Sequence, residues 1–265
     1  MQTVAFKHLT VSRFILGGNP FSGFSHQSIE RNDQMRRYFT TERIKATLRE
    51  AEALGVNTLI ARADAFIIRV YQEHCDEGGT IQWFAQTCPE YRDHAASVQR
   101  AAAAGAKACY IHGGVMDNLY AQGHLDEVQP VLDSIRAHGM LAGIAAHEAL
   151  TIAWAEEHLD LDFFMCSYYN PSERSRNPEH IPGTVENYLE SDRQAMTAQI
   201  QRLTRPAIHY KILAAGRNEP QAAFAFAASK MRPCDAVCVG VCPAQNPDML
   251  KEDVRLLDEL LTRQY

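Results

Sequence analysis

Short apolar runs alternate with longer stretches of helical periodicity along the whole chain. Apolar runs of this length, bounded by glycine, proline or polar residues, are typical of buried strands. The sequence predicts eight of them, at Arg13–Gly18, Val56–Ala61, Ile81–Ala85, Lys107–Ile111, Met140–Ala146, Leu161–Cys166, Pro206–Tyr210 and Asp235–Val239. The segments between them predict helices, most clearly at Thr41–Leu54, Tyr91–Ala104, Leu125–His138 and Asp248–Leu261.

A strand followed by a helix, repeated eight times in 265 residues, is typical of a closed (β/α)8 barrel, the TIM barrel. No linker or low-complexity tract interrupts the pattern, so we expect residues 1–265 to form one α/β barrel domain. Enzymes of this architecture react at the carboxyl ends of the strands. The longest irregular segment, from Ser167 to Thr184, follows the sixth predicted strand and is a candidate lid.

Composition narrows the possible partners and the compartment. The net charge is −6, and the Lys and Arg residues are scattered, which argues against binding nucleic acid. No apolar run approaches the ~20 residues of a membrane span, so no membrane contact is expected. Seven cysteines without paired spacing indicate reduced thiols, and hence a cytoplasmic protein. A small-molecule substrate is the partner that these features leave.

Five segments, in matching order, resemble the aldo-keto reductase superfamily over nearly the whole chain. They are Leu9–Gly17, Ala53–Asn57, Tyr110–His112, Tyr169–Arg174 and Tyr210–Gly216. The resemblance implies an N-terminal β-hairpin before the barrel and NADPH as cofactor. It also implies that His112 is the active-site histidine and that Tyr210 stacks on the nicotinamide.

The chain departs from the family at most of the catalytic and cofactor-binding positions. The family's catalytic Asp, Tyr and Lys, its carboxamide-binding Ser-Asn pair and the partnering Gln correspond to Ile60, a position near Ala65, Cys88, Ala146-His147 and Cys166. The last loop, Val241–Asn246, also lacks the basic cluster that grips the phosphate of NADPH. Of the catalytic tetrad only His112 remains. Carbonyl reduction needs a proton donor of suitable pKa, so the departures predict a reductase-like barrel with different chemistry.

Polar residues at the strand ends are the candidates for that chemistry. Period-two alternation places a set of them on the inward face of their strands: His112, His147, Cys166, Gln86 and Arg62. His112 and His147 end adjacent strands and could bind a divalent metal such as Zn or Mn. The third ligand would come from Asp64, Glu148, Cys166 or His26. The alternative is that His112 only hydrogen-bonds a substrate oxygen while His147 caps the next helix.

Lys211 is the second candidate for catalysis. Desolvation at a strand end could depress its pKa, which would let it act as a base or form a Schiff base. A solvated lysine or a carboxylate anchor is the alternative, because Lys211 directly follows Tyr210 and only one of them can point inward in a regular strand. With Lys211, the predicted catalytic residues are His112, His147 and Asp64. The predicted substrate-binding residues are Asn19, Arg62, Gln86, Tyr169, Asn170, Tyr210 and Arg217.

These observations favour an enzyme of the lyase, isomerase or hydrolase type. We expect a small polar substrate, sugar-like or an oxo acid, as in carbohydrate metabolism, and acid/base or metal-assisted chemistry by the two histidines. The alternative is a divergent NAD(P)-dependent aldo-keto reductase. A second alternative is a non-catalytic barrel that binds a metabolite, because fold alone does not imply function.

Overall fold

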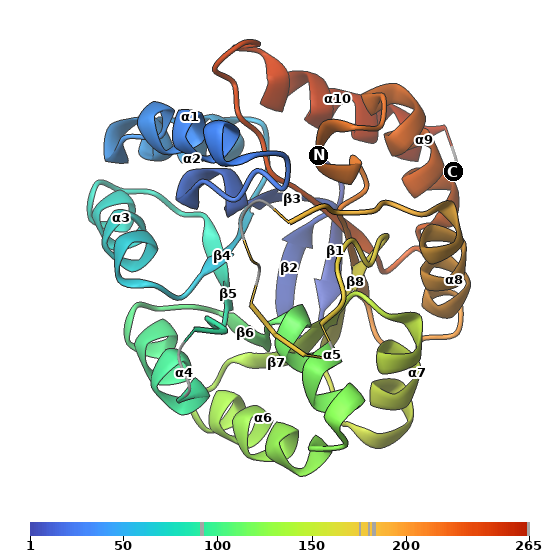
Figure 1. Cartoon of the computed structure of the whole chain (residues 1–265). Helices are drawn as coiled ribbons and strands as arrows, with labels where there is room; N and C mark the ends of the chain where they lie inside the picture. The colour runs from blue at the N-terminus through green and yellow to red at the C-terminus, as the bar shows by residue number, and fades with distance from the viewer. Residues whose placement is uncertain (91–92, 175, 180, 182–183, 264–265) are drawn as a thin grey trace.

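Eight parallel strands close into a barrel, as the sequence predicts (Figure 1). The computed structural model describes residues 1–90, 93–174, 176–179, 181 and 184–263. The strand order around the barrel is β10-β3-β4-β5-β6-β7-β8-β9. The strands are β3 (Phe14–Gly17), β4 (Thr58–Arg62), β5 (Gln82–Gln86), β6 (Ala108–Ile111), β7 (Leu141–Ala146), β8 (Phe163–Ser167), β9 (Ala207–Tyr210) and β10 (Ala236–Val239).

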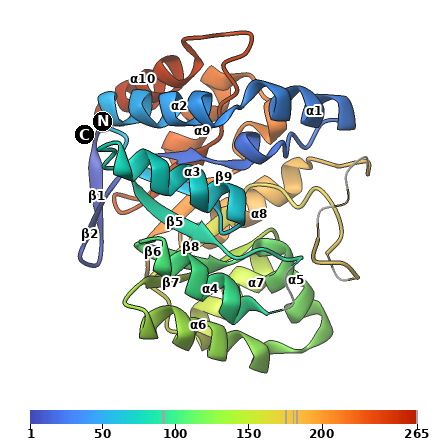
Figure 2. The same ribbon diagram turned by 90° about the vertical axis from the view of Figure 1, so that its left-hand side faces the viewer.

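The predicted N-terminal hairpin is also present. Strands β1 (Thr3–Phe6) and β2 (Leu9–Ser12) pair antiparallel, with Thr3 opposite Ser12. Phe6 and Val11 pack into the barrel interior, and the Phe6 ring lies 6.2 Å from that of Phe84. The hairpin thus closes the amino-terminal end of the barrel. Figure 2 shows it at the side opposite the long trace that follows β8.

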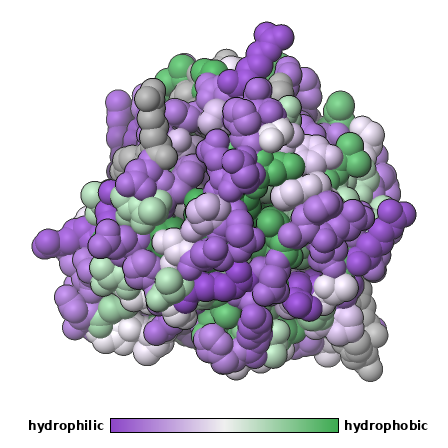
Figure 3. All heavy atoms as spheres, turned by 90° about the horizontal axis from the view of Figure 1, so that it is seen from below, coloured by the Kyte–Doolittle hydropathy of each residue, from purple (hydrophilic) through white to green (hydrophobic). Residues whose placement is uncertain are grey.

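Helices surround the barrel and cover the outer face of the strands (Figure 1). They are α1 (Ile29–Tyr38), α2 (Thr41–Ala53), α3 (Ala65–Asp76), α4 (His94–Ala103), α5 (Gly113–Gln122), α6 (Val128–Ala137), α7 (Ala149–His158), α8 (Glu190–Ile200), α9 (Pro220–Lys230) and α10 (Met249–Thr262), with short 3₁₀ turns at Asn19–Ser22, Leu125–Glu127 and Ala214–Gly216. The side turned to the viewer in Figure 3 is mostly hydrophilic, with small apolar patches between polar side chains. This is the pattern of helices that bury one face only. Within the described ranges no helix combines the length and apolar character that crossing a membrane requires.

Local sequence explains where several helices begin. The Thr40 hydroxyl accepts a hydrogen bond from the Arg43 amide, and Asp64 accepts one from the Ile67 amide. Such N-caps satisfy backbone donors that the first turn leaves without partners. The predicted helix Leu125–His138 is a 3₁₀ turn followed by α6. Tyr91, the first residue of the predicted helix Tyr91–Ala104 that corresponds to α4, lies outside the described residues.

The core has two layers that follow the alternation of the strands. Ile60, Phe84, Tyr110 and Met165 point into the barrel, whereas the residues between them pack against the helices. Cys166 belongs to the outer layer, so its predicted inward orientation is wrong. Its neighbour Met165 holds the inward position, because successive side chains of a strand point to opposite faces.

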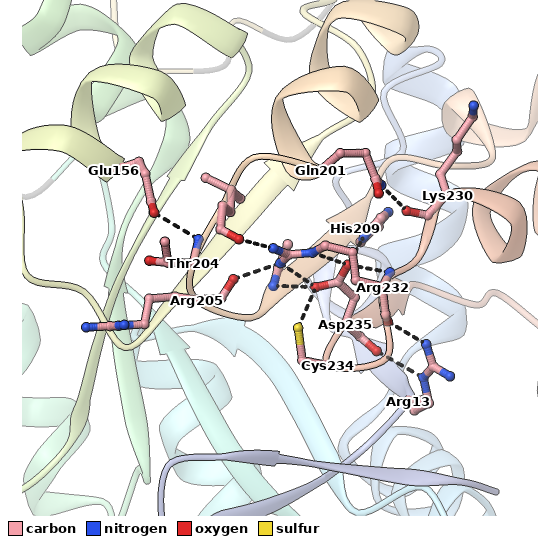
Figure 4. A network of polar contacts seen from close by, with 12 residues as sticks. Arg13, Glu156, Gln201, Thr204, Arg205, His209, Lys230, Arg232, Cys234 and Asp235 are labelled. Carbon is pink, nitrogen blue, oxygen red and sulfur yellow. Dashed lines mark hydrogen bonds and ion pairs between the residues drawn. The ribbon is translucent and has the colours of Figure 1, made fainter.

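A buried polar cluster lies at the amino-terminal end of β10, next to the start of β9 (Figure 4). Asp235 is fully buried and accepts hydrogen bonds from the Ala207 amide (2.9 Å) and from the amide and guanidinium of Arg232. His209 Nε2 lies 3.2 Å from the same carboxylate. Arg13 Nε donates to the Asp235 carbonyl (3.1 Å). These donors converge on Asp235, so the cluster ties the starts of β3, β9 and β10 together at this end.

Candidate functional site

A cavity of about 510 Å³ opens at the carboxyl ends of the barrel strands. Each of the eight strands contributes to its lining, either through its last residues or through those that follow it, from Gly17 on β3 to Gly240 after β10. In barrels of this class catalysis takes place at this end. Polar side chains after β6, β7 and β9, among them His112, His147 and Lys211, form part of this lining.

His112 follows β6 and occupies the N-cap position of α5. Its Nδ1 accepts a hydrogen bond from the Gly114 amide (3.1 Å), which leaves the proton of the neutral ring on Nε2. Burial lowers the pKa of His112 well below its usual range, and His147 and Arg174 lower it further. His112 is therefore a neutral imidazole that can donate one hydrogen bond through Nε2.

His147 follows β7 and is held by a buried carboxylate. Its Nδ1 lies 2.8 Å from Asp117 Oδ2, and its backbone amide donates to the same oxygen (2.9 Å). Burial lowers the pKa of His147 well below its usual range. Burial also raises the pKa of Asp117 to about 7, although the amides of His147 and Glu148 oppose the shift. Burial thus disfavours the charged form of both groups. We infer that the His147 imidazole is neutral and that its Nδ1 proton faces the carboxylate.

Lys211 lines the same cavity as Tyr210, although the two residues are adjacent in sequence. Strand β9 ends at Tyr210, and Lys211 has a φ of 58°, which breaks the alternation of the strand. Both side chains can therefore face the cavity. Burial lowers the pKa of Lys211 to about 8, with Glu186 opposing and Arg174 and Arg217 adding to the shift. A lysine of this pKa can exchange a proton near neutral pH.

A chain of hydrogen bonds leads from Lys211 to the segment before α8. Lys211 Nζ lies 3.4 Å from His26 Nε2, and His26 Nδ1 lies 2.8 Å from Glu186 Oε1. The Tyr188 hydroxyl donates to the other oxygen of Glu186 (2.7 Å). The Arg217 guanidinium lies 4.4 Å from the centre of the Tyr188 ring and donates to the His26 carbonyl. The loops after β3, β8 and β9 are therefore joined beside Lys211, and Figure 1 shows the trace after β8 crossing the mouth.

Arg174 adds a buried cation to the cavity lining. Its side chain is 3% exposed and donates to the Glu179 carbonyl (2.6 Å), while its Nε has no hydrogen-bond partner. Within the described ranges no carboxylate lies within ion-pair distance of its guanidinium. Its charge is one cause of the lowered pKa of His112, His147 and Lys211.

The structure places four of the seven predicted binding residues in the cavity lining: Asn19, Arg62, Gln86 and Tyr210. Gln86 accepts a hydrogen bond from the hydroxyl of Tyr110 (3.0 Å), which lies deeper in the barrel. Arg62 is paired with Asp64 and Glu90. The Tyr210 ring packs edge-on against His147, with centroids 6.0 Å apart.

The other predicted residues lie outside this lining, and each has a structural partner. Asp64 caps α3 and pairs with Arg62, so its predicted catalytic role does not fit its position. The Tyr169 hydroxyl accepts from Asn218, and Asn170 donates to Glu148. Arg217 is exposed and donates to the backbone carbonyls of His26 and Ala214.

Among the described residues, the structure does not bring together the ligands of the predicted metal centre. His112 and His147 line one cavity, and His147 is one cause of the lowered pKa of His112. In the part of the chain that the structure describes, however, no three His, Cys, Asp or Glu side chains are grouped as a metal ion would require. Asp64 is engaged as a cap, Cys166 faces outward and His147 Nδ1 is taken by Asp117. Nor does His147 cap the next helix, since Glu148 holds the N-cap position of α7.

Sequence reasoning missed three carboxylates that matter here: Asp117, Glu186 and Asp253. Asp117 lies on α5, which begins with two glycines, and this weak helical signal hid the helix. Asp253 lies on the buried face of α10 and also lines the cavity. The sequence did contain a signal for Asp253: an acidic residue on the apolar face of a predicted helix is unusual and indicates a buried carboxylate.

No protein-family model matches the chain, and no curated protein matches its sequence. Solved structures match its fold. A protein described as a candidate aldo-keto reductase from Pseudomonas aeruginosa shares 17% identity, with 98% of this chain and 95% of that one covered and a TM-score of 0.65. The holo form of an aldo-keto reductase from Bacillus halodurans shares 12% identity, with 98% and 93% covered and a TM-score of 0.61. A variant of the protein Gox0644 in complex with NADPH shares 12%, with 98% and 94% covered and a TM-score of 0.56.

The chain has a divergent aldo-keto reductase-like barrel. The resemblance inferred from five sequence segments is thereby confirmed at the level of the fold. The preference for a lyase, isomerase or hydrolase is wrong, because the solved structures with this fold are mostly aldo-keto reductases. A heptulosonate-phosphate synthase and an aldolase are minor matches. The matches lend no support to metal binding or to a place in carbohydrate metabolism, and they favour the oxidoreductase alternative.

The cavity residues fit one end of a nicotinamide dinucleotide better than the other. Tyr210 offers an aromatic ring in the lining, beside two neutral imidazoles and Lys211. The cavity also extends across the mouth to α10, as a ligand with two nucleosides requires. The loop from Gly240 to Asp248 contains no Lys or Arg, so the phosphate of NADPH has no basic cluster there. The nicotinamide end therefore fits, and the phosphate clamp is missing.

Proposed function

We propose that the protein is an NAD(P)H-dependent oxidoreductase that reduces the carbonyl group of a small molecule. One observation carries the proposal: Tyr210, His112 and Lys211 line a single cavity at the reactive end of a reductase-like barrel. Each has a property that carbonyl reduction uses. The likeness to aldo-keto reductases, one of them in its holo form, supports the same reaction class.

When bound, the nicotinamide supplies the hydride that adds to the carbonyl carbon. The chain's own residues act on the carbonyl oxygen. His112, neutral with its proton on Nε2, donates a hydrogen bond to that oxygen and polarises the carbonyl bond. Lys211, with a pKa of about 8, is mostly protonated at neutral pH and delivers the proton that completes the alcohol.

The proton that Lys211 gives up is replaced along the hydrogen bonds that join it to His26 and Glu186. His147 acts indirectly. Its contact with Asp117 fixes the ring, and the ring packs against Tyr210, which would lie against the nicotinamide. In this scheme Lys211 replaces the tyrosine that the family uses as proton donor.

All seven cysteines are free thiols, which supports a reducing compartment, and we propose a cytoplasmic enzyme. Its other partner would be the small carbonyl compound itself, for which we propose a polar molecule because polar side chains surround the reacting end of the cavity.

The test mixes the protein with NADH or NADPH and a panel of aldehydes and ketones and follows nicotinamide absorbance. We expect carbonyl-dependent oxidation of at least one nucleotide. We also expect a loss of about 10²-fold or more in Lys211→Met and a smaller loss in His112→Phe. Quenching of tryptophan fluorescence measures nucleotide binding separately. A protein that binds neither nucleotide, or whose turnover survives Lys211→Met, would refute the proposal.

A further inference from the structure

The cavity continues to the rim opposite the two histidines. Gly240 and Cys242 follow β10, and Met249 and Asp253 lie on α10, yet all four line the same cavity as His112. In the closed strand order β10 stands four places from β6, which is diametrically opposite in a barrel of eight. A ligand that fills the cavity therefore reaches from the end of β6 to α10, beyond the size of a small carbonyl substrate.

Asp253 has an unusual environment at that rim. Its side chain is 7% exposed, and among the described residues no donor or cation lies within hydrogen-bonding or ion-pair distance of its carboxylate. Burial raises the pKa of Asp253 to about 7, and Glu252 adds to the shift. A carboxylate withdrawn from water is costly unless it receives hydrogen bonds. Its position in the cavity lining makes it available to donors on a ligand.

The surroundings of Asp253 disfavour a phosphate group. No Lys or Arg occurs from Gly240 to Asp248, and Asp248 and Glu252 add negative charge at the start of α10. The N-terminus of α9, a potential anion site, is occupied by its own N-cap, since Glu219 accepts from the Gln221 and Ala222 amides. A further dianionic phosphate beside these carboxylates would meet like-charge repulsion.

We propose that Asp253 accepts hydrogen bonds from the ribose hydroxyls of the cofactor's adenosine half, and that the protein therefore selects NADH over NADPH. This inference rests on the proposed function, because it assumes that the nicotinamide half lies near Tyr210. The two hydroxyls of a ribose supply the donors that the carboxylate lacks, and a 2′-phosphate removes one of them and adds charge. The residue acts on affinity and specificity, apart from the reacting carbonyl.

One basic residue could oppose this selection. Arg31 on α1 lines the cavity, and its Nη1 donates to the Gln34 side chain (3.1 Å). If its guanidinium gripped a 2′-phosphate, NADPH would bind at least as tightly as NADH. An Arg31→Gln variant separates this possibility from the role of Asp253.

The experiment titrates NADH and NADPH separately into the protein and measures both dissociation constants from tryptophan fluorescence. We expect NADH to bind at least about tenfold more tightly than NADPH. Asp253→Asn and Asp253→Ser should reduce this ratio to about threefold or less, with NADPH gaining affinity. Glu259→Gln is the matched control, because it removes an exposed charge from the same helix at a position outside the cavity lining and should keep the preference. Thermal unfolding of each variant checks that it folds.

The outcomes distinguish this inference from the proposed function. If both nucleotides bind with equal affinity, or NADPH binds more tightly and Arg31→Gln abolishes that advantage, the selectivity is refuted while the oxidoreductase stands. If the ratio in wild type persists in both Asp253 variants, the assignment to Asp253 is refuted. If neither nucleotide binds, both proposals fail together.

Discussion

Two buried aspartate–histidine pairs lie at opposite ends of this barrel, and the pKa values of their carboxyl groups are shifted in opposite directions. At the closed end, Asp235 lies 3.2 Å from His209 Nε2, and at the mouth, Asp117 lies 2.8 Å from His147 Nδ1. Burial opposes ionisation in both. The pKa of Asp235 is nevertheless held below its usual range, whereas that of Asp117 is raised to about 7.

The difference comes from the groups that reach Asp235: hydrogen bonds from His209 and from the Arg232 cation both lower its pKa. Arg232 places two guanidinium nitrogens and its amide on Asp235, and it compensates the loss of water (Figure 4). In the described part of the chain Asp117 forms no ion pair with Lys or Arg, and its hydrogen-bond partners include two backbone amides and a neutral imidazole. At the closed end the buried charges therefore pair with each other and stabilise the fold. The mouth keeps groups whose protonation can change near neutral pH, as reaction sites do.

Removing the carboxylate at the closed end should have the largest effect on stability. Asp235→Asn leaves the Arg232 guanidinium buried without its counter-charge, and we expect a loss of about 3–5 kcal/mol in the free energy of unfolding. Because the folded-state pKa of Asp235 is depressed, its contribution is present above the ordinary aspartate pKa near 4 and is lost as the pH falls below it. Urea denaturation at neutral and acid pH measures both. A variant as stable as wild type would contradict the stabilising role assigned to Asp235.

The corresponding change at the mouth should act on turnover. Asp117→Asn keeps the shape of the side chain but alters the hydrogen bond that fixes the His147 ring, and we expect turnover to fall by about 10- to 100-fold. The unfolding free energy should change by less than in Asp235→Asn. Steady-state kinetics and urea denaturation of the same preparation give the comparison. Asp133→Asn, an exposed position on α6, is the control. Unchanged turnover would remove Asp117 and His147 from the site.

Replacing Lys211 should measure how much the burial of a charged lysine at the mouth lowers the stability of the folded protein. Its folded pKa is about 8, against 10.5 for an ordinary lysine, so below pH 8 the folded protein bears the full penalty of the buried charge. Lys211→Met should therefore raise the free energy of unfolding by about 1–3 kcal/mol at neutral pH. The gain should shrink as the pH rises from about 8 to 10.5, where the unfolded lysine also loses its proton. Denaturation across this range measures it, and a destabilised variant at neutral pH would contradict the assigned burial.

The smallest effect belongs to Asp64, which is polar and near the mouth but has a structural role. Asp64→Ala removes the cap of α3 and should cost about 1 kcal/mol of stability. Turnover should change little, because its carboxylate lies outside the cavity lining. A large loss of activity at unchanged stability would return Asp64 to the catalytic residues.

The sequence predicts the barrel well because its signal is periodic and repeated. Each of the eight apolar runs is a strand, with ends that shift by no more than two residues. The inward positions of His112 and His147 also follow from alternation, and both residues line the cavity. Period two fails where the backbone leaves the strand, so it could not place Lys211, whose φ of 58° lets it share the cavity with Tyr210.

The functional assignments were harder, because several roles share one sequence signature. A polar residue after a strand can be a helix cap, as Asp64 is, or a cavity residue, as His112 is. The role of Asp117 could not be predicted, because it lies in the middle of a helix that begins with Gly113 and Gly114 and that the sequence pattern does not indicate. The missing Tyr and Lys of the family favoured a different reaction. The structure places Lys211 in the cavity lining, and we propose it as the proton donor instead.

The central claim, that the mouth is a reductase site with Lys211 as proton donor, is tested most directly by the pH dependence of turnover with NADH. We expect the rate to be constant below about pH 8 and to fall about tenfold for each further pH unit, as Lys211 loses its proton. Lys211→Met should be slow and should lack this decline. A wild-type rate that stays constant well above pH 8, or the same decline in Lys211→Met, would contradict the account.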